Sequence, residues 1–256
     1  MKSLAIVGGA GRMGQALAEG LSATGRFTVA ALIDEHEPRE LFGGRFVSSL
    51  DELDAGSIDA VVDFSSPQGV AHSAAWCSAH VVALVVGATG LSEEQLRNLR
   101  DAAEHVSVVV ASNFSVGAVL AERFAGAAAP YFDRVEIVEL HHDKKVDAPS
   151  GTSLATARRI AEARRAANQS PFVDPTTRFS VEGSRGADGA DGVKIHSVRL
   201  PGLVAHQEVL FGSSGEGLTI RHDSFDRQSF VHGVALALDA VDATPRFIDG
   251  ISSLIN

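Results

Sequence analysis

The sequence predicts an α/β protein in which a doubly wound parallel sheet is followed by a second domain of α+β class with a mixed or antiparallel sheet. Short apolar runs alternate with helical patterns as far as Gly117, which is typical of parallel strands joined by helices. A glycine-rich turn joins the first apolar run to the first helical pattern. Near the C-terminus, three strand patterns follow one another with only turns between them, which favours antiparallel pairing.

The glycine-rich turn predicts a dinucleotide site. Leu4–Val7 is an apolar run typical of a buried parallel strand, and a helical pattern covers residues 12–22. Between them, Gly9, Gly11 and Gly14 form the pattern G-x-G-x-x-G. Glycine is needed there for a tight turn, for close approach of the backbone to a pyrophosphate and for close packing of the helix on the strand. We therefore expect the first sheet to be of Rossmann type.

The second strand pattern ends in a carboxylate. Phe27–Ile33 is followed by Asp34, about 20 residues beyond the glycines, where an acidic side chain accepts hydrogen bonds from the adenosine ribose. A carboxylate there repels a 2′-phosphate, so NADH is favoured. NADPH can still be used if the nearby cations Arg12 and Arg39 offset that repulsion. The alternative is that Asp34 is only a solvated strand end.

Three more strand patterns end in polar or glycine-rich turns. They cover residues 60–64, 81–86 and 106–111, with helical patterns starting at Ser66-Pro67 and at the capping box formed by Ser92 and Gln95. The carboxyl ends of parallel strands share one edge of the sheet, and ligands bind at that edge. We therefore expect the Gly87–Gly90 turn and the 112–117 turn to lie beside Gly8 and Asp34.

The pattern changes after Gly117, and we expect a second domain there. Its elements are helices over 116–128 and 152–167, strands over 134–140, 193–200, 204–211 and 218–222, a loop over 169–192 and a hairpin turn over 212–217. An amphipathic helix over 226–241 then returns to the first domain. The predicted division is a dinucleotide-binding domain of residues 1–114 plus 225–256 and a substrate-binding and oligomerisation domain of residues 115–224.

The stretch Glu139–Thr152 concentrates the groups that can carry acid–base chemistry. It holds the pairs His141-His142 and Lys144-Lys145, and it ends in a Pro-Ser-Gly-Thr turn before a helical pattern. Imidazole and ammonium groups can donate protons to a reacting group. The unpaired N–H groups at the start of a helix can hold a carboxylate. The alternative is an ordinary polar turn on a solvated loop.

Composition excludes several classes of function. The net charge of −10 leaves no basic surplus to neutralise phosphates, so nucleic acid is not expected as a partner. The single cysteine, Cys77, allows no intrachain disulfide and suits a reducing cytoplasm; its apolar surroundings favour a buried structural thiol. The longest apolar run, Val81–Val86, is too short to span a bilayer, and no signal segment precedes the first strand. We expect no membrane partner.

Taken together, these motifs resemble the 4-hydroxy-tetrahydrodipicolinate reductase (dihydrodipicolinate reductase) family of bacterial lysine and diaminopimelate biosynthesis. The matching segments cover most of the chain and are the Gly8–Gly14 turn, Asp34, Val61–Phe64, Gly87–Gly90, Ser112–Gly117, Glu139–Thr152, Ser197–Arg199, Leu203–Glu208 and Arg221–Arg227. The His-His…Lys…Ala-Pro-Ser-Gly-Thr signature is the most specific of them. The resemblance implies reduction of a cyclic imine dicarboxylate by NADH or NADPH, in a cytoplasmic homotetramer assembled through the second domain's sheet.

The resemblance also implies roles for individual residues. His141 corresponds to the catalytic acid–base group, and Lys145 to the proton donor and carboxylate partner. The implied cofactor-binding residues are Gly8, Gly9, Ala10, Gly11, Arg12 and Met13 for the diphosphate, Asp34 for the ribose, and Gly87, Ala88, Thr89, Ala111, Ser112, Asn113 and Phe114 for the nicotinamide side. The implied substrate-binding residues are His142, Gly151 and Thr152. One position departs from the family pattern, because Ala88 stands where Gly-Thr-Thr-Gly is usual.

Three alternatives remain open at this point. The first domain alone would suit a different two-domain nicotinamide-dependent oxidoreductase, but the Glu139–Thr152 stretch favours the reductase. A non-catalytic dinucleotide-sensing protein would be expected to lack the acid groups, whereas His141 and Lys145 are both present. A metal enzyme could use His141, His142 and Asp143 or Asp147, but no thiolate or HExxH spacing supports such a site. We therefore expect no metal.

Overall fold

The computed structural model describes residues 1–242 and 244–255. The chain divides into two compact units, one formed by Met1–Val116 with Arg227–Asn256 and the other by Gly117–Asp226. Each unit has its own sheet and its own apolar core. No helix within the described residues is both long and apolar enough to cross a bilayer.

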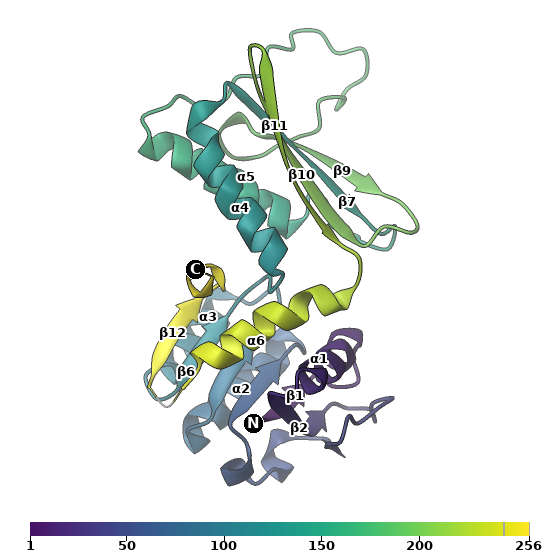
Figure 1. Cartoon of the computed structure of the whole chain (residues 1–256), viewed down its shortest axis with the longest axis vertical. Helices are drawn as coiled ribbons and strands as arrows, with labels where there is room; N and C mark the ends of the chain where they lie inside the picture. The colour runs from purple at the N-terminus through teal and green to yellow at the C-terminus, as the bar shows by residue number, and fades with distance from the viewer. Residues whose placement is uncertain (243, 256) are drawn as a thin grey trace. The chain divides into compact units, whose positions relative to one another are not determined.

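The first unit is built on a seven-stranded sheet in which every pair of neighbouring strands is parallel (Figure 1). Its order is β12 (Arg246–Asp249), β6 (Ser107–Val110), β5 (Ala83–Val86), β4 (Ala60–Asp63), β1 (Lys2–Val7), β2 (Phe27–Ile33) and β3 (Arg45–Val47). The central strands are buried throughout, because helices cover both faces. The doubly wound sheet expected from the sequence is therefore confirmed.

Four helices flank this sheet. They are α1 (Arg12–Ala23), α2 (Pro67–His80), α3 (Glu93–Ala102) and α6 (Val231–Ala240), the last preceded by a 3₁₀ turn at Arg227–Phe230. Helices α2 and α3 pack on one face through Val70, Trp76, Cys77 and Leu99. Helix α1 contacts α6 and the 3₁₀ turn before it. Helix α3 begins at the expected capping box, in which Ser92 Oγ accepts from Gln95 N and Gln95 Oε1 accepts from Ser92 N.

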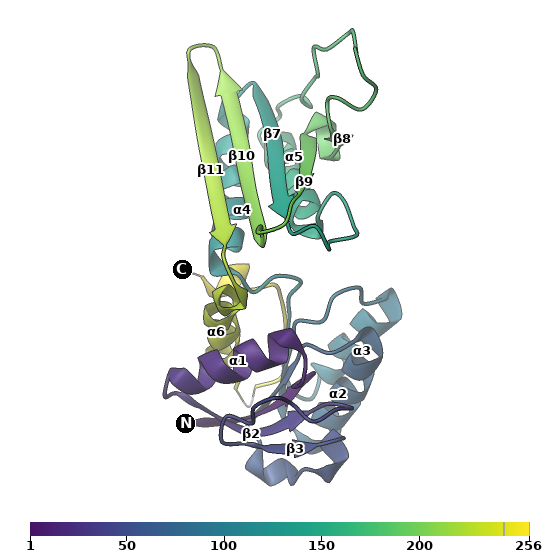
Figure 2. The same cartoon turned by 90° about the vertical axis from the view of Figure 1, so that its right-hand side faces the viewer.

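The second unit contains a five-stranded mixed sheet covered on one face by two helices (Figure 2). Its order is β11 (Glu216–Ser224), β10 (Ala205–Ser213), β7 (Arg134–His141), β9 (Lys194–Arg199) and β8 (Ala187–Asp188), and its helices are α4 (Val116–Ala128) and α5 (Gly151–Ala166). Only the β7–β9 pair is parallel. Ile137, Val209 and Ile195 on neighbouring strands form a core with Ile160 of α5. A mixed second sheet is therefore confirmed.

Several element boundaries differ from the expectation. The hairpin turn is much shorter than 212–217, because Gly212 pairs with Gly217 and Ser213 with Glu216, and Gly215 supplies the positive φ of 86°. Strand β5 begins at Ala83 because Val81, with φ 57°, ends helix α2 in a left-handed conformation. The short strands β3, β8 and β12 were not expected; they lie at or next to sheet edges and carry no distinctive sequence pattern.

Candidate active site

The glycine-rich turn of the first unit is shaped by close backbone contacts. Gly8 has φ +81°, and a Cβ at this position would lie 2.9 Å from the Phe64 carbonyl oxygen. A Cβ at Gly14 would lie 2.2 Å from the Gly8 carbonyl oxygen, so helix α1 sits directly on the turn. Gly11 caps α1 without a side-chain hydrogen bond. The first N–H groups of the helix therefore remain available to an anion such as a diphosphate.

Asp34 lies where the sequence places it, against this turn. Its Oδ2 accepts from Ala10 N at 2.9 Å, and its Oδ1 accepts from Glu35 N at 2.8 Å. Gln15 of α1, which sequence reasoning did not single out, donates to the Gly9 carbonyl at 2.8 Å and accepts from Glu40 N at 3.1 Å. These bonds fix the carboxylate and the turn in one arrangement.

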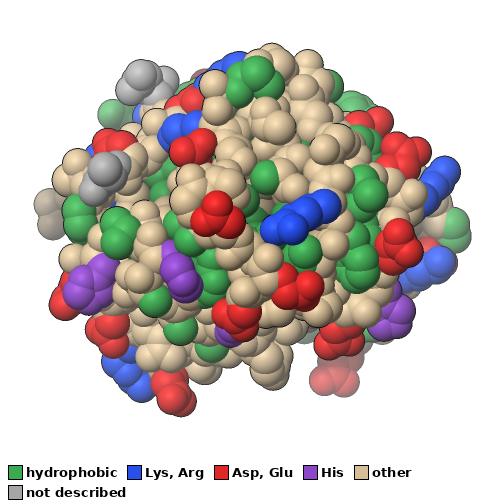
Figure 3. Space-filling view, turned by 90° about the horizontal axis from the view of Figure 1, so that it is seen from below, with side chains coloured by type: hydrophobic (Ala, Val, Ile, Leu, Met, Phe, Trp, Pro, Cys, Tyr) green, Lys and Arg blue, Asp and Glu red, His purple; other side chains and the backbone are tan. Residues whose placement is uncertain are grey.

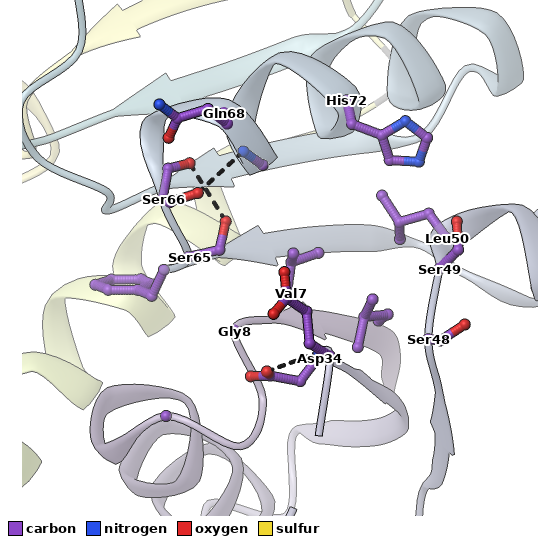
Figure 4. A pocket seen from close by; sticks show the side chains of 15 residues that line it. Val7, Gly8, Asp34, Ser48, Ser49, Leu50, Ser65, Ser66, Gln68 and His72 are labelled. Carbon is purple, nitrogen blue, oxygen red and sulfur yellow. Dashed lines mark hydrogen bonds between the residues drawn. The ribbon is translucent and has the colours of Figure 1, made fainter. Parts of the chain in front are cut away.

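A pocket of about 600 Å³ opens beside the turn (Figure 4). Its lining residues are Val7, Gly8, Gly11, Ile33, Asp34, Glu35, Ser48, Ser49, Leu50, Phe64, Ser65, Ser66, Gln68, Gly69 and His72. Figure 4 shows the Ser48–Leu50 segment, and Ser65, Ser66 and His72 from the region of helix α2, around Asp34. Among the described residues, its charged or titratable lining groups are Asp34, Glu35 and His72. The pocket has the size and the carboxylate that an adenosine moiety requires.

Several lining residues were not singled out from the sequence, although Ser49 and Glu52 form a capping box. Ser48 and Ser49 are held by Glu52, whose Oε1 accepts from both backbone N–H groups at 2.9 and 3.1 Å. Ser65 is held by Asp63, which also accepts from Ser73 Oγ at 2.6 Å. Burial raises the pKa of Asp63, although these hydrogen bonds oppose the shift. A capping box predicts the start of a helical turn but not a pocket, because sheet order sets which loops meet at the pocket.

The segments expected on the nicotinamide side follow strands β5 and β6. Gly87 N donates to the Asp63 carbonyl at 2.8 Å, and Ala111 N donates to the Val86 carbonyl at 3.0 Å. A Cβ at Gly87 would lie 2.1 Å from the Phe64 ring, and that ring is 5.5 Å from the Phe114 ring. Thr89 is exposed, Ser112 is exposed, and Asn113 Oδ1 accepts from Ser115 N at 2.8 Å.

Ala88 differs from its neighbours because it is buried in the apolar cluster between the sheet and helices α2 and α3. The residue is 7% exposed. A hydroxyl at this position would have to be buried among apolar side chains. The alanine therefore fits its apolar surroundings in this chain.

The second unit gathers the acid–base groups around a buried carboxylate. Glu139 is fully buried and accepts from His141 Nδ1 at 2.5 Å, from Arg199 Nη1 and Nη2 at 2.8 Å each, and from Ser150 N at 3.2 Å. Lys145 Nζ donates to both carboxylate oxygens of Asp147 at 2.8 Å. The structure thus brings His141 into one hydrogen-bonded group with Glu139 and Arg199, two residues to which sequence reasoning gave no role.

Titration of this group is shifted by its surroundings. Burial lowers the pKa of His141; Glu139 opposes that shift, and the nearby charges of Lys145 and Arg199 add to it. Burial alone would raise the pKa of Glu139, but hydrogen bonds from Arg199, Ser197 and His141 outweigh it, and the pKa lies below its ordinary value. Perturbed titration of grouped side chains is typical of functional sites.

The start of helix α5 completes this group. Ser150 caps the helix by accepting from Ser153 N at 3.2 Å, and a Cβ at Gly151 would meet nothing within 4 Å. Ser153 Oγ donates to Gln207 Oε1 at 2.7 Å, which ties the helix start to strand β10. Thr152 lies in the first turn, and His142 Nδ1 is buried without a hydrogen-bond partner in the described part of the chain. No three His, Cys, Asp or Glu side chains of residues 1–242 and 244–255 are grouped to hold a metal ion.

Comparison with known proteins agrees with both halves of this description. Residues 2–114 match the family model for the N-terminus of dihydrodipicolinate reductase, and residues 117–254 match the model for its C-terminus. The chain belongs to the dihydrodipicolinate reductase family. The assignment made from sequence is confirmed, and with it the enzyme class, a nicotinamide-dependent oxidoreductase of diaminopimelate and lysine biosynthesis.

Individual relatives cover the whole chain. The 4-hydroxy-tetrahydrodipicolinate reductase of Enterococcus faecalis is 42% identical, with 100% of both chains covered. That of Mycolicibacterium gilvum is 44% identical, with 98% of both covered. Among solved structures, dipicolinate-bound dihydrodipicolinate reductase from a Paenisporosarcina species has a TM-score of 0.87 at 37% identity and covers 100% of both chains. An NAD complex of an enzyme of gentamicin A biosynthesis, 20% identical with a TM-score of 0.61 and covering 94% of this chain and 86% of its own, shares the fold.

Proposed function

We propose that this chain reduces 4-hydroxy-tetrahydrodipicolinate to tetrahydrodipicolinate, with NADH as the favoured cofactor and a His/Lys pair handling the proton. The observation that carries the proposal is the grouping of His141, Glu139 and Arg199 at the start of helix α5, with Lys145 on the adjoining turn. The family membership supplies the substrate class, and this grouping supplies the acid–base chemistry that the reduction needs.

The glycine turn and the pocket beside it fit a dinucleotide. Gly8 to Met13 would hold the diphosphate, because side chains larger than hydrogen at Gly8 and Gly14 would collide with backbone and Gly11 caps the helix without a side chain. When bound, the reduced nicotinamide supplies a hydride. Gly87 to Thr89 and Ala111 to Phe114 would border the nicotinamide side. Asp34 and Glu35 both line the pocket. Two carboxylates beside an adenosine ribose would repel a 2′-phosphate, which supports NADH as the favoured cofactor and NADPH as the alternative.

The substrate would be held by cations and N–H donors of the second unit. A cyclic imine dicarboxylate needs such groups for its two carboxylates. The Paenisporosarcina relative is described as binding dipicolinate, which is also a dicarboxylate. In this chain we assign carboxylate binding to Lys145, His142 and the backbone of Gly151 and Thr152. The open space at Gly151 supports this assignment.

Loss of water from the 4-hydroxy substrate gives a conjugated cyclic imine. Hydride addition to that imine leaves negative charge towards the ring nitrogen, and a positioned acid neutralises it. Lys145 can donate as an ammonium group. His141 is mostly neutral at pH values above its lowered pKa, so it can take up a proton at Nε2 and pass it on. We therefore assign donation to Lys145 and proton relay to His141.

We further propose that the enzyme is a cytoplasmic homotetramer joined through the sheet of the second unit. Helices α4 and α5 cover only one face of that sheet. The other face presents Val138, Val198 and the exposed Leu210 among charged side chains such as Glu136 and Glu208, which gives a mixed apolar and charged surface for a second copy. Analytical ultracentrifugation would test the assembly.

The deciding experiment is a coupled assay. The preceding synthase would generate the precursor from pyruvate and aspartate semialdehyde, and loss of nicotinamide absorbance would be followed with NADH and, separately, NADPH. Precursor-dependent oxidation that is faster with NADH is expected. A folded protein that binds NADH but oxidises neither cofactor would favour the sensing alternative. Oxidation that depends on a different substrate would favour another two-domain oxidoreductase.

A further inference from the structure

We propose that Glu139, held by Arg199, is a positioning residue that fixes the tautomer of His141, with the hydrogen on Nδ1 and the lone pair of Nε2 presented for proton transfer. The inference rests on the proposed function, because it assigns a mechanism to His141. Neither Glu139 nor Arg199 is placed in contact with substrate or cofactor.

The hydrogen-bond geometry leaves one arrangement for the ring. An ionised carboxylate only accepts hydrogen bonds. His141 Nδ1 lies 2.5 Å from Glu139 Oε2, so Nδ1 is the nitrogen that carries the hydrogen. The second nitrogen, Nε2, is then the basic one in the neutral ring. Glu139 and His141 are two residues apart on strand β7 and share one face of the sheet, which is why the carboxylate reaches the near edge of the imidazole.

Arg199 keeps this carboxylate ionised although it is fully buried. Its Nη1 and Nη2 reach both Glu139 oxygens at 2.8 Å in a two-point contact. The same cation balances the charge of Glu139, so the carboxylate does not force a proton onto the imidazole. Burial therefore lowers the pKa of His141 despite the adjacent carboxylate.

Arg199 also reaches the second proton-carrying group. Its Nη2 donates to the Asp147 carbonyl at 2.7 Å, and the Asp147 carboxylate holds Lys145 Nζ. Strand pairing puts Arg199 beside His141 on the neighbouring parallel strand. One guanidinium therefore fixes the ring through Glu139 and the lysine turn through Asp147.

The same strand offers a matched control. Glu136 bonds to His196 Nε2 at 2.6 Å and to Arg185, so it has the same kinds of partner as Glu139. It projects from the opposite face of β7 and its side chain is 33% exposed. Glu136→Gln removes a comparable charge pair without touching the His141 group. Because Glu136 lies on the face assigned to assembly, the oligomeric state of this variant is checked by ultracentrifugation.

The experiment combines nitrogen-15 NMR of the imidazoles with steady-state kinetics. In the wild-type enzyme the His141 signals, assigned by their loss in His141→Gln, are expected to show a neutral ring with hydrogen on Nδ1. Glu139→Gln should lose this single tautomer and lower kcat by roughly 10²-fold, the lower end of what a positioned acid–base group contributes. The KM for NADH should stay within twofold, and the pH profile of kcat should shift. Arg199→Lys should also lower kcat, because lysine cannot make the two-point contact. The loss should be smaller than in Glu139→Gln, because lysine keeps a positive charge beside the carboxylate.

Glu136→Gln should retain wild-type turnover and the wild-type His141 signals. Hydrogen on Nε2 in the wild-type enzyme would overturn the proposal, and so would wild-type turnover and pH profile in Glu139→Gln. If Glu139→Gln fails to fold, the wild-type spectrum and the kinetics of Arg199→Lys still test the proposed role of Glu139. An inactive wild-type enzyme would refute the proposed reaction, whereas the tautomer would still be read from the spectrum, so the two failures are distinguishable.

Discussion

Lys145 and His141 are the residues at which a single substitution should remove most of the turnover. Lys145→Ala and His141→Gln are expected to lower kcat by roughly 10²–10⁴-fold, the contribution of a positioned proton-transfer group. NADH affinity, measured by fluorescence titration, should be nearly unchanged, because the dinucleotide pocket is built entirely from the first unit. Lys144→Ala is the matched control, since Lys144 is exposed. Wild-type kcat in either test variant would disprove the role assigned to that residue.

Gly151 gives a test of substrate binding that leaves folding intact. A Cβ at Gly151 meets nothing within 4 Å and the residue begins helix α5, so Gly151→Ala should fold normally. If the substrate carboxylate occupies that open space, the methyl group should raise the KM for the precursor by about tenfold or more, equivalent to about 1.4 kcal/mol. Gly212→Ala, also with nothing within 4 Å, is the control. An unchanged KM in Gly151→Ala would place the carboxylate elsewhere.

Some residues of the site can be predicted from the sequence alone, and others cannot. His141, Lys145 and Gly151 lie in one short stretch, so residue type and spacing were enough to group them. Arg199 bonds to Glu139 across a separation of 60 residues. That contact depends on the parallel register of β7 with β9, in which His141 pairs with Arg199. No local sequence pattern specifies the register between strands that are distant in the sequence. Glu139, two residues before His141, looks like any other residue of an alternating strand.

At the scale of the elements, the packing of α1 on the glycine turn is the feature most sensitive to a small change. Gly14→Ala would place a Cβ 2.2 Å from a backbone oxygen that cannot move without shifting the turn. We expect a loss of about 1–3 kcal/mol in the free energy of unfolding, the usual range for overpacking, together with much weaker NADH binding. Urea denaturation and NADH titration measure the two effects. Gly56→Ala, whose Cβ would have an ordinary 3.4 Å contact, should change neither.

Elements whose hydrophobic pattern agrees with a cap, a proline or a clear end signal could be predicted to within a residue or two. Strand β2 and helix α4 match their expected ranges, and α2 and α3 start at the caps and proline that the sequence contains. Elements without such signals were missed. Strand β12 pairs with β6 only because the chain returns to the first unit after residue 226. The sequence predicts strands β10 and β11 that are too short, because Gly and Ser at 212–214 look like turn residues. In the structure the pairing of the two strands continues as far as Ser213 and Glu216.

For the whole molecule, the buried titratable groups act on stability in two directions. His141 and His222 have lowered pKa values, chiefly because of burial. Between those values and the ordinary value near 6.5, the unfolded chain binds protons that the folded chain does not, so stability is lost as pH falls through this window. Asp63 and Glu122 have raised pKa values because of burial. Between their ordinary values and those raised values the folded chain holds protons that the unfolded chain has lost, so these two groups add stability as pH falls. The acidic and basic side chains at the surface are interspersed on the face shown in Figure 3, where exposed pairs contribute little.

The lowered pKa of His222 predicts that the stability of the folded enzyme falls in mild acid. Wild-type Tm, measured by calorimetry, should fall between pH 7.5 and 5.5, by about 2–4 °C for each kcal/mol lost. His222→Gln cannot take up the proton in either state, so its Tm should fall less over the same range. The contributions of Asp63 and Glu122 cancel in the comparison because both proteins contain them. His36→Gln is the control, since His36 is exposed. If the Tm of His222→Gln falls with pH as steeply as that of the wild type, burial of the His222 ring does not couple folding to pH.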